Sequence, residues 1–216
     1  MRVEVWSDIM CPWCYIGKRR LERALAGFEH AAEVEVEWRS FQLDPGHPKG
    51  ERQPVHEALA KKTGRSLAQV RGMTDHVKAL AAEEGLAYDF DRAVVVNSFD
   101  AHRLTHLAKK YGLGAETHER FMRGNLVEGE VLDDQDTLVR LAAETGVPEE
   151  EARRVLAGDD HAGDVRADIA QAHAYGATGV PFFVLDRAYG VSGAQPVTTF
   201  AAALRTAYEH AATAAR

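Results

Sequence analysis

The sequence has few cysteines and few aromatic residues, and it lacks long apolar runs. Only two of its 216 residues are cysteine, which excludes a framework of several structural disulfides. A structural zinc site is disfavoured, because it takes four Cys or His ligands and the chain has no second CxxC pair. No run approaches the roughly 18 apolar residues of a membrane span. We therefore expect no metal ion, no organic cofactor and no membrane partner.

The net charge and the first residues of the chain exclude further classes of protein. The net charge is -7, with 45% hydrophobic and 27% charged residues, which is the range of a globular protein with a real core. This acidic balance gives no sign of a nucleic-acid partner. Residues Met1 to Trp6 alternate and carry charge, so they lack the apolar segment of a secretory signal peptide. We expect a cytoplasmic protein, and in that reducing compartment a cysteine pair is more often catalytic than structural.

Both cysteines lie in one segment, Ser7–Tyr15, between a strand pattern and a helix pattern. A CxxC pair in this context is typical of a thioredoxin-like redox site. If Pro12 occupies the first helical turn, Cys11 lies at the N-cap, where unpaired backbone N–H groups stabilise a thiolate. A free thiol with a pKa of about 8.5 can then fall to roughly 3.5 to 7.5. Cys11 is the predicted nucleophile, and Cys14 is predicted to resolve the mixed disulfide.

Two other interpretations of the cysteine pair stay open, namely metal binding and inert burial. His102 and His106 are four residues apart on a predicted helix and could share a metal ion. Such a pair is more often a solvated or packed helix face.

Sheet signals occur at the two ends of the chain, with helical patterns between them. The predicted strands are 3–7, 33–41, 180–185 and 189–192. The predicted helices are 12–28, 67–85, 97–111, 115–127, 134–145, 148–156, 161–175 and a last one from Pro196. No convincing strand appears between about Pro54 and Tyr175.

The order of these elements predicts the fold class. The ends give β-α-β followed by β-β-α, which is the thioredoxin arrangement, an α/β fold with a central mixed sheet flanked by helices. Residues 1–45 and 176–216 would form the thioredoxin-like domain, and residues 46–175 an inserted all-helical domain.

Pro181 opens a predicted strand, where proline is tolerated. Taken alone, its peptide bond is more often trans, but an X-Pro bond can be cis at modest cost. A cis Val180–Pro181 bond would turn the backbone of Val180 outward, where it could pair with an extended substrate. The CxxC pair and the order of the elements favour the cis form.

Five segments follow one another in a characteristic order: Ser7–Cys14, Phe41–Pro45, Asn97–Ser98 with Ala101–Leu104, Gly179–Phe183 and Val191–Pro196. In these segments the chain resembles the FrnE-type branch of the DsbA-like thioredoxin-fold oxidoreductases. The resemblance implies catalytic roles for Cys11, Cys14 and a cis Pro181 that faces them. It also implies thiol–disulfide exchange through a mixed disulfide, with protein or small-molecule thiols as substrates. Some members carry a second, C-terminal cysteine pair, which this chain lacks.

The predicted substrate-binding residues are Pro12, Trp13, Val180, Asn97 and His102. The last two match a family pattern, although by physics alone Asn97 is a helix cap and His102 a packed histidine. Asp8 is close enough to the sulfurs to matter: an ionised carboxylate would oppose a thiolate, and a protonated one could relay a proton. Glutathione is a candidate partner, and a monomer and a homodimer are both open.

The same family resembles kappa-class glutathione transferases and 2-hydroxychromene-2-carboxylate isomerases, which typically have serine at the nucleophile position. The alternative function is therefore a glutathione-dependent isomerase or transferase, with an apolar pocket in the helical domain. The presence of both Cys11 and Cys14 disfavours this alternative function. A third interpretation is a binding module with vestigial cysteines.

Overall fold

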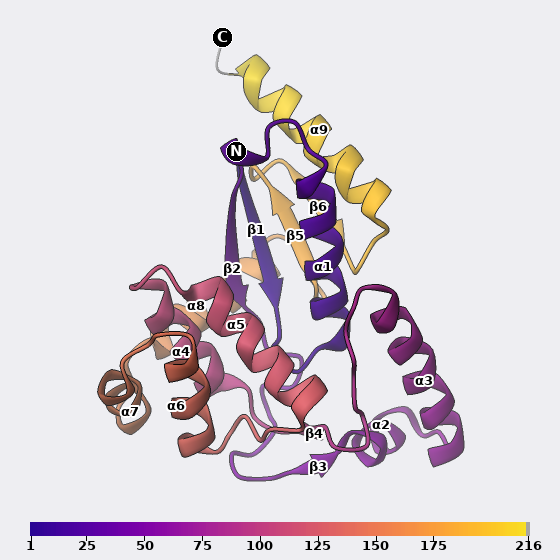
Figure 1. Cartoon of the computed structure of the whole chain (residues 1–216), viewed down its shortest axis with the longest axis vertical. Coiled ribbons are helices and arrows are strands. Elements are labelled where there is room, and N and C mark those ends of the chain that lie inside the picture. The colour runs from indigo at the N-terminus through magenta and orange to yellow at the C-terminus, as the bar shows by residue number, and fades with distance from the viewer. Residues whose placement is uncertain (215–216) are drawn as a thin grey trace.

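The computed structural model describes residues 1–214 and has a four-stranded mixed sheet at its centre (Figure 1). The strands are β1 (Arg2–Ser7), β2 (Glu35–Ser40), β5 (Phe182–Leu185) and β6 (Tyr189–Ser192), in the spatial order β2-β1-β5-β6. β2 runs parallel to β1, whereas β5 is antiparallel to both β1 and β6. The predicted thioredoxin-like arrangement is confirmed.

The helices flank this sheet and fill the long connection between β2 and β5. They are α1 (Pro12–Ala26), α2 (Val55–Thr63), α3 (Leu67–Glu83), α4 (Phe99–Lys109), α5 (Gly114–Arg123), α6 (Gln135–Glu144), α7 (Glu149–Ala157), α8 (Ala162–Ala174) and α9 (Val197–Ala214). A 3₁₀ turn covers Ala31–Glu33, and a π-helical turn, Gly124–Glu128, follows α5. The helical region is inserted as expected.

Two features of this region differ from the sequence prediction. A short strand β4 (Val94–Val95) pairs antiparallel with β3 (Gln53–Pro54), so the expectation of no strand there was wrong. Strands of two residues are too short to show an alternating pattern. Helix α2 was not predicted, and its only buried residue is His56, so its sequence has no clear apolar stripe.

One face of the sheet packs against α1 and α9 (Figure 1). The alternation of β1 places Val3 and Val5 on this face, as predicted, where they join a core with Phe200 of α9. The rings of Phe183 and Phe200 are 4.7 Å apart and nearly perpendicular, at 73°. Apolar contact with the sheet therefore holds α9 in place.

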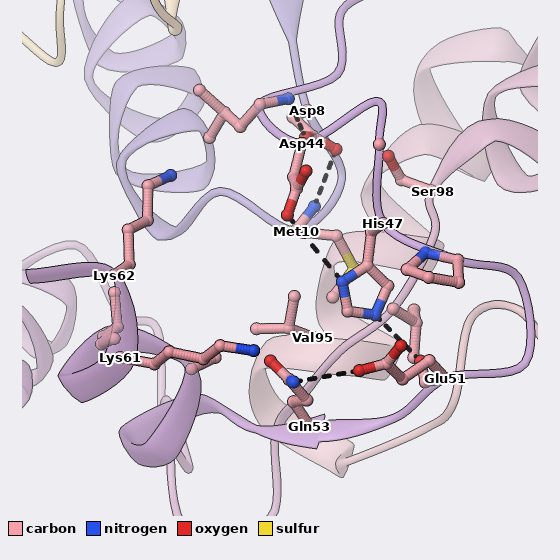
Figure 2. A pocket seen from close by; sticks show the side chains of 16 residues that line it. Asp8, Met10, Asp44, His47, Glu51, Gln53, Lys61, Lys62, Val95 and Ser98 are labelled. Atoms are coloured by element: carbon pink, nitrogen blue, oxygen red, sulfur yellow. Dashed lines mark hydrogen bonds and ion pairs between the residues drawn. The ribbon is translucent and has the colours of Figure 1, made fainter.

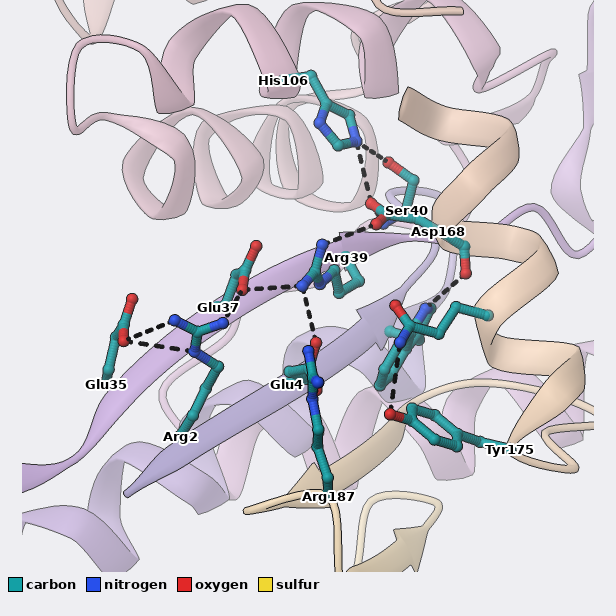
Figure 3. Close-up of polar contacts among 12 residues, drawn as sticks. Arg2, Glu4, Glu35, Glu37, Arg39, Ser40, His106, Asp168, Tyr175 and Arg187 are labelled. Atoms are coloured by element: carbon teal, nitrogen blue, oxygen red, sulfur yellow. Dashed lines mark hydrogen bonds and ion pairs between the residues drawn. The ribbon is translucent and has the colours of Figure 1, made fainter. Parts of the chain in front are cut away.

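The opposite face of the sheet binds α8 through charged side chains (Figure 3). Arg39 donates to Glu4 at 2.7 Å and to Asp168 of α8 at 3.1 Å. Asp168 also accepts from the Ser40 backbone N–H at 2.9 Å and lies 3.0 Å from His106 Nε2. Although burial opposes it, hydrogen bonds from His106 and Ser40 hold the pKa of Asp168 below its usual range. These contacts fix α8, which leads into β5.

Helix α1 belongs to two cores at once. Its C-terminal half contributes Leu21 and Ala24 to the core beneath α9. Its N-terminal half contributes Tyr15 and Ile16 to the core of the helical region, together with Phe121 of α5. The N-terminus of α1, where the CxxC pair lies, is therefore positioned by both parts of the chain.

Replacing Phe200 with Ala should lower the free energy of unfolding by about 3–5 kcal/mol, since it leaves a cavity beside Phe183. Urea titration followed by circular dichroism measures this loss. Thr206→Ala, on the exposed side of the same helix, is the matched control and should change stability by about 0.5 kcal/mol at most. Equal stability of the two variants would show that α9 is not held by this contact.

Candidate active site

The loop between β1 and α1 brings Cys11 to the N-terminus of the helix. Cys11 is the N-cap residue with extended backbone angles, φ -90° and ψ 114°, and Pro12 occupies the first turn. Proline suits this position because its missing N–H would have no partner within the helix. The backbone N–H of Cys11 donates to the Asp8 carbonyl oxygen at 3.0 Å. The N-cap position predicted for Cys11 is confirmed.

The segment that enters β5 faces Cys11. The peptide bond between Val180 and Pro181 is cis, and the Cys11 thiol lies 3.7 Å from the Val180 carbonyl oxygen. Helix α1 approaches so closely because Gly17 has no side chain, and a Cβ there would lie 3.0 Å from Pro181 Cγ. Residues from the two ends of the chain thus meet at one site, with the cis bond that the resemblance implied.

The two sulfurs lie in unequal surroundings. Both cysteines are free, with 4% of Cys11 and 0% of Cys14 exposed. Burial raises the pKa of the Cys14 thiol well above its usual range, and the proximity of Cys11 raises it further. Hydrogen bonds from Ser7 and from the Asp8 backbone oppose this rise but do not reverse it. Cys14 is therefore a neutral thiol near pH 7, which fits the resolving role better than the nucleophilic one.

A buried polar pair beneath the cysteines was missed by the sequence analysis. Ser7 Oγ and His118 Nε2 are 2.8 Å apart, and the His118 ring stacks on Trp38 with centroids 5.1 Å apart. His118 lies on α5, 111 positions from Ser7, so no local pattern connects them. Burial, together with the charges of His102 and Lys18, holds the pKa of His118 well below its usual range. The imidazole is therefore neutral at pH 7.

Asp8 joins the redox loop to the loop that follows β2. Its carboxylate accepts from the backbone N–H of Leu43 at 2.8 Å and of Met10 at 3.3 Å. His102 Nε2 lies 3.5 Å from Asp8 Oδ1. The His102 side chain is completely buried, so a substrate at the surface does not touch it in this arrangement.

Asn97 lies just before α4 and is also buried. Its Oδ1 accepts from the Phe99 backbone N–H at 2.9 Å, and its Nδ2 donates to the His47 carbonyl oxygen at 2.6 Å. It therefore helps to cap α4, the alternative that physics alone favoured. Trp13, by contrast, is 37% exposed next to Cys11, where a substrate could contact it.

A pocket of about 770 Å³ opens beside the redox loop (Figure 2). Asp8 and Met10 line one side, and the loop after β2 and helix α2 line the others. Lys61 of α2 reaches into the pocket, and Lys62 lies at its edge (Figure 2). Met10 directly precedes Cys11 in the chain, but Cys11 itself does not line the pocket.

The two histidines considered as a metal pair bind different groups. His106 Nε2 contacts Asp168 and Ser40, whereas His102 faces Asp8. Over residues 1–214 the structure contains no group of three or more His, Cys, Asp or Glu side chains that could hold a metal ion. Every helix in that range is too short or too polar to cross a bilayer.

These features, a CxxC pair at a helix N-terminus opposite a cis-proline on a mixed four-stranded sheet, define a thioredoxin-fold protein with a dithiol site. Residues 2–205 match the DSBA-like thioredoxin domain family, and the chain belongs to this family.

Known relatives agree with this assignment. The crystal structure of a probable DsbA oxidoreductase, SCO1869 from Streptomyces coelicolor, is 51% identical, with a TM-score of 0.94 over 97% of this chain and 90% of the other. The uncharacterized protein YwbO of Bacillus subtilis is 29% identical over 148 residues, 68% of this chain and 67% of its own. A 2-hydroxychromene-2-carboxylate isomerase shares the fold, with a TM-score of 0.71 over 99% of this chain and 98% of its own, at 15% identity.

The unequal surroundings of the two thiols predict unequal reactivity. At pH 7, iodoacetamide should alkylate Cys11 at least about tenfold faster than Cys14, because Cys14 is fully buried and neutral. Peptide mass spectrometry after timed quenching measures both rates. In guanidinium chloride the difference should disappear. Faster labelling of Cys14 in the folded protein would contradict the assignment of roles.

The buried His118 predicts a loss of stability on acidification. Its pKa is lowered by folding, so below pH 6.5 the unfolded state binds a proton that the native state does not. Stability should then fall as the pH falls, by up to about 1.4 kcal/mol per unit for this one group. Chemical unfolding of the wild type and His118→Gln between pH 7 and 5 should show a smaller slope for the variant. Equal slopes for the wild type and the variant would show that folding does not lower the pKa of His118.

Proposed function

We propose that the protein is a thiol–disulfide oxidoreductase that exchanges the Cys11–Cys14 dithiol or disulfide with protein or small-molecule thiol substrates. The observation that carries this proposal is the position of Cys11 at the N-terminus of α1, with its sulfur 3.7 Å from the Val180 carbonyl oxygen. A thiolate at a helix N-terminus is a stabilised nucleophile. Family membership and the 51% identity to a probable DsbA oxidoreductase support the proposal.

The exchange takes two steps in the direction that reduces a substrate. The Cys11 thiolate attacks one sulfur of a substrate disulfide, forms a mixed disulfide and releases the first substrate thiolate. Cys14 then attacks the Cys11 sulfur, closes the internal disulfide and releases the second. The reverse sequence oxidises a substrate dithiol.

The surroundings of Cys11 suggest how substrates bind. Trp13 and Leu43 are 37% and 42% exposed and offer apolar contact to a polypeptide. The backbone of Val180 can pair with an extended chain beside the mixed disulfide. Lys61 and Lys62 suit a small thiol that carries carboxylates, such as glutathione.

Two finer assignments also belong to this proposal. The order of the motifs supports the FrnE-type branch of the family. The lone cysteine pair supports a cytoplasmic location, where thiols are kept reduced and such a pair is more often catalytic than structural.

The pocket beside Met10 favours a second candidate, a glutathione-dependent isomerase or transferase. Its volume of about 770 Å³ is within the range of small-molecule sites. In that case Cys11 alone would act, and Cys14 would be dispensable.

Cysteine variants distinguish the two candidates. Cys11→Ser should abolish exchange with glutathione disulfide, and Cys14→Ala should keep the first attack but accumulate the mixed disulfide. Mass spectrometry after alkylation in glutathione buffers counts each species. Full exchange activity in Cys11→Ser would refute the proposal. Absence of an internal disulfide in the wild type, together with measurable glutathione binding and a fully active Cys14→Ala variant, would favour the isomerase.

A further inference from the structure

The guanidinium group of Arg20 connects three segments that are far apart in the sequence. Arg20 lies on α1, three residues after Gly17. Its Nε donates to Oε1 of Glu84, the C-cap residue of α3, at 2.8 Å. Its Nη1 donates to the carbonyl oxygen of Ala194 at 2.7 Å, and Ala194 lies in the loop between β6 and α9. One side chain therefore joins the redox helix to the inserted helices and to this loop.

The loop at Ala194 borders the segment that faces Cys11. The backbone N–H of Gly193 donates to the Pro181 carbonyl oxygen at 2.8 Å, which continues the pairing of β5 with β6 by one hydrogen bond. A Cβ on Gly17 would lie 3.0 Å from Pro181 Cγ and 3.6 Å from Ala194 Cα, so both residues adjoin the same point of α1. A displacement of Ala194 would therefore also displace Pro181.

Glu84 holds the Arg20 side chain in its direction. The Glu84 side chain is only 4% exposed and pairs with both Arg20 and Arg23. Although burial opposes it, the hydrogen bonds from these two arginines hold the pKa of Glu84 below its usual range, so the carboxylate is charged at pH 7. A guanidinium presents its N–H groups in a fixed planar fork, which suits it to hold two acceptors in one geometry.

We propose that Arg20 is a positioning residue for polypeptide substrates, an inference that rests on the exchange function proposed above. By binding the Ala194 carbonyl, Arg20 fixes the neighbouring Gly193 N–H, which in turn holds the Pro181 carbonyl. The backbone of Val180 then stays in place to pair with an extended chain beside Cys11. Arg20 acts through this backbone and not on the sulfurs. Its contribution is preorganisation, because a segment that is already ordered loses less conformational entropy when a polypeptide binds.

Two substrates with the same leaving group test this role. One is a short peptide whose single cysteine forms a disulfide with 5-thio-2-nitrobenzoate. The other is 5,5′-dithiobis(2-nitrobenzoate), which has no peptide backbone to pair with Val180. In both, the Cys11 thiolate attacks, a Cys11–substrate disulfide forms, and the coloured thiolate leaves with the electron pair of the broken S–S bond. Stopped-flow absorbance of the reduced protein, at increasing substrate concentration, measures the first release.

Arg20→Met keeps an unbranched stem and loses both donors. In this variant we expect the half-saturating concentration of the peptide to rise about 5- to 20-fold. The rate at saturation, and the rate with the small disulfide, should stay within about twofold of the wild type. Arg20→Lys keeps the charge without the planar fork, so its value for the peptide should lie between the two. If the peptide does not saturate, the ratio of the second-order rate constants for the two substrates gives the same comparison.

Arg23→Met is the matched control. Arg23 also donates to Glu84, at 2.9 Å, but its side chain is 61% exposed, and it is Arg20 that binds the Ala194 carbonyl. The control should keep all three values.

An unchanged half-saturating concentration of the peptide in Arg20→Met would overturn the proposal. An equal loss with both substrates would indicate a general effect on the site and would also overturn it. The same shift in Arg23→Met would assign the effect to Glu84 instead of the contact with Ala194. If the wild type releases no thiolate from either substrate, the exchange function itself fails. If Arg20→Met does not fold, Arg20→Lys decides the outcome.

Discussion

The site depends on one close contact, that between helix α1 and the Val180–Pro181 segment. Gly17 favours this contact, because a Cβ at that position would lie only 3.0 Å from Pro181 Cγ and would press on the ring. The contact also requires that α1 is held firmly along its length. The sheet core holds its C-terminal half and the helical core its N-terminal half. The distance between the Cys11 sulfur and the Val180 carbonyl thus depends on packing in both parts of the chain.

The position of each cysteine on α1 gives the two thiols different environments. Cys11 lies at the N-cap, where the helix N-terminus favours negative charge, whereas Cys14 lies one turn further on and has no exposed surface. Desolvation therefore raises the pKa of Cys14, and this supports the nucleophilic role proposed for Cys11. The inserted helices provide much of the wall that excludes water from Cys14, so the insertion contributes to the site itself.

The sequence was informative where the signal was local. Alternation predicted the faces of β1, the CxxC pair with Pro12 predicted the N-cap, and the order of the motifs predicted the fold and the cis-proline. Long-range partners carried no such signal. His118 contacts Ser7 although the two residues are 111 positions apart in the sequence. The sequence of its helix shows only an amphipathic pattern. The sequence analysis missed the pairing of β3 with β4 and the polar helix α2. Short or weakly buried elements show no periodic spacing of apolar residues.

Buried polar atoms without hydrogen-bond partners lie close to the redox loop and also elsewhere in the described chain. Both ring nitrogens of His102 and the Nδ1 of His118 lack hydrogen-bond partners within the described chain, although both rings are almost fully buried. Such atoms also occur in the contact between α8 and the sheet, where Asp168 is well paired but Glu4 Oε2 and Arg39 Nε lack partners within the described chain. A missing partner therefore does not by itself mark a functional site in this chain. The contacts with Asp8 and Ser7, rather than the missing partners, are therefore what connect His102 and His118 to the redox loop.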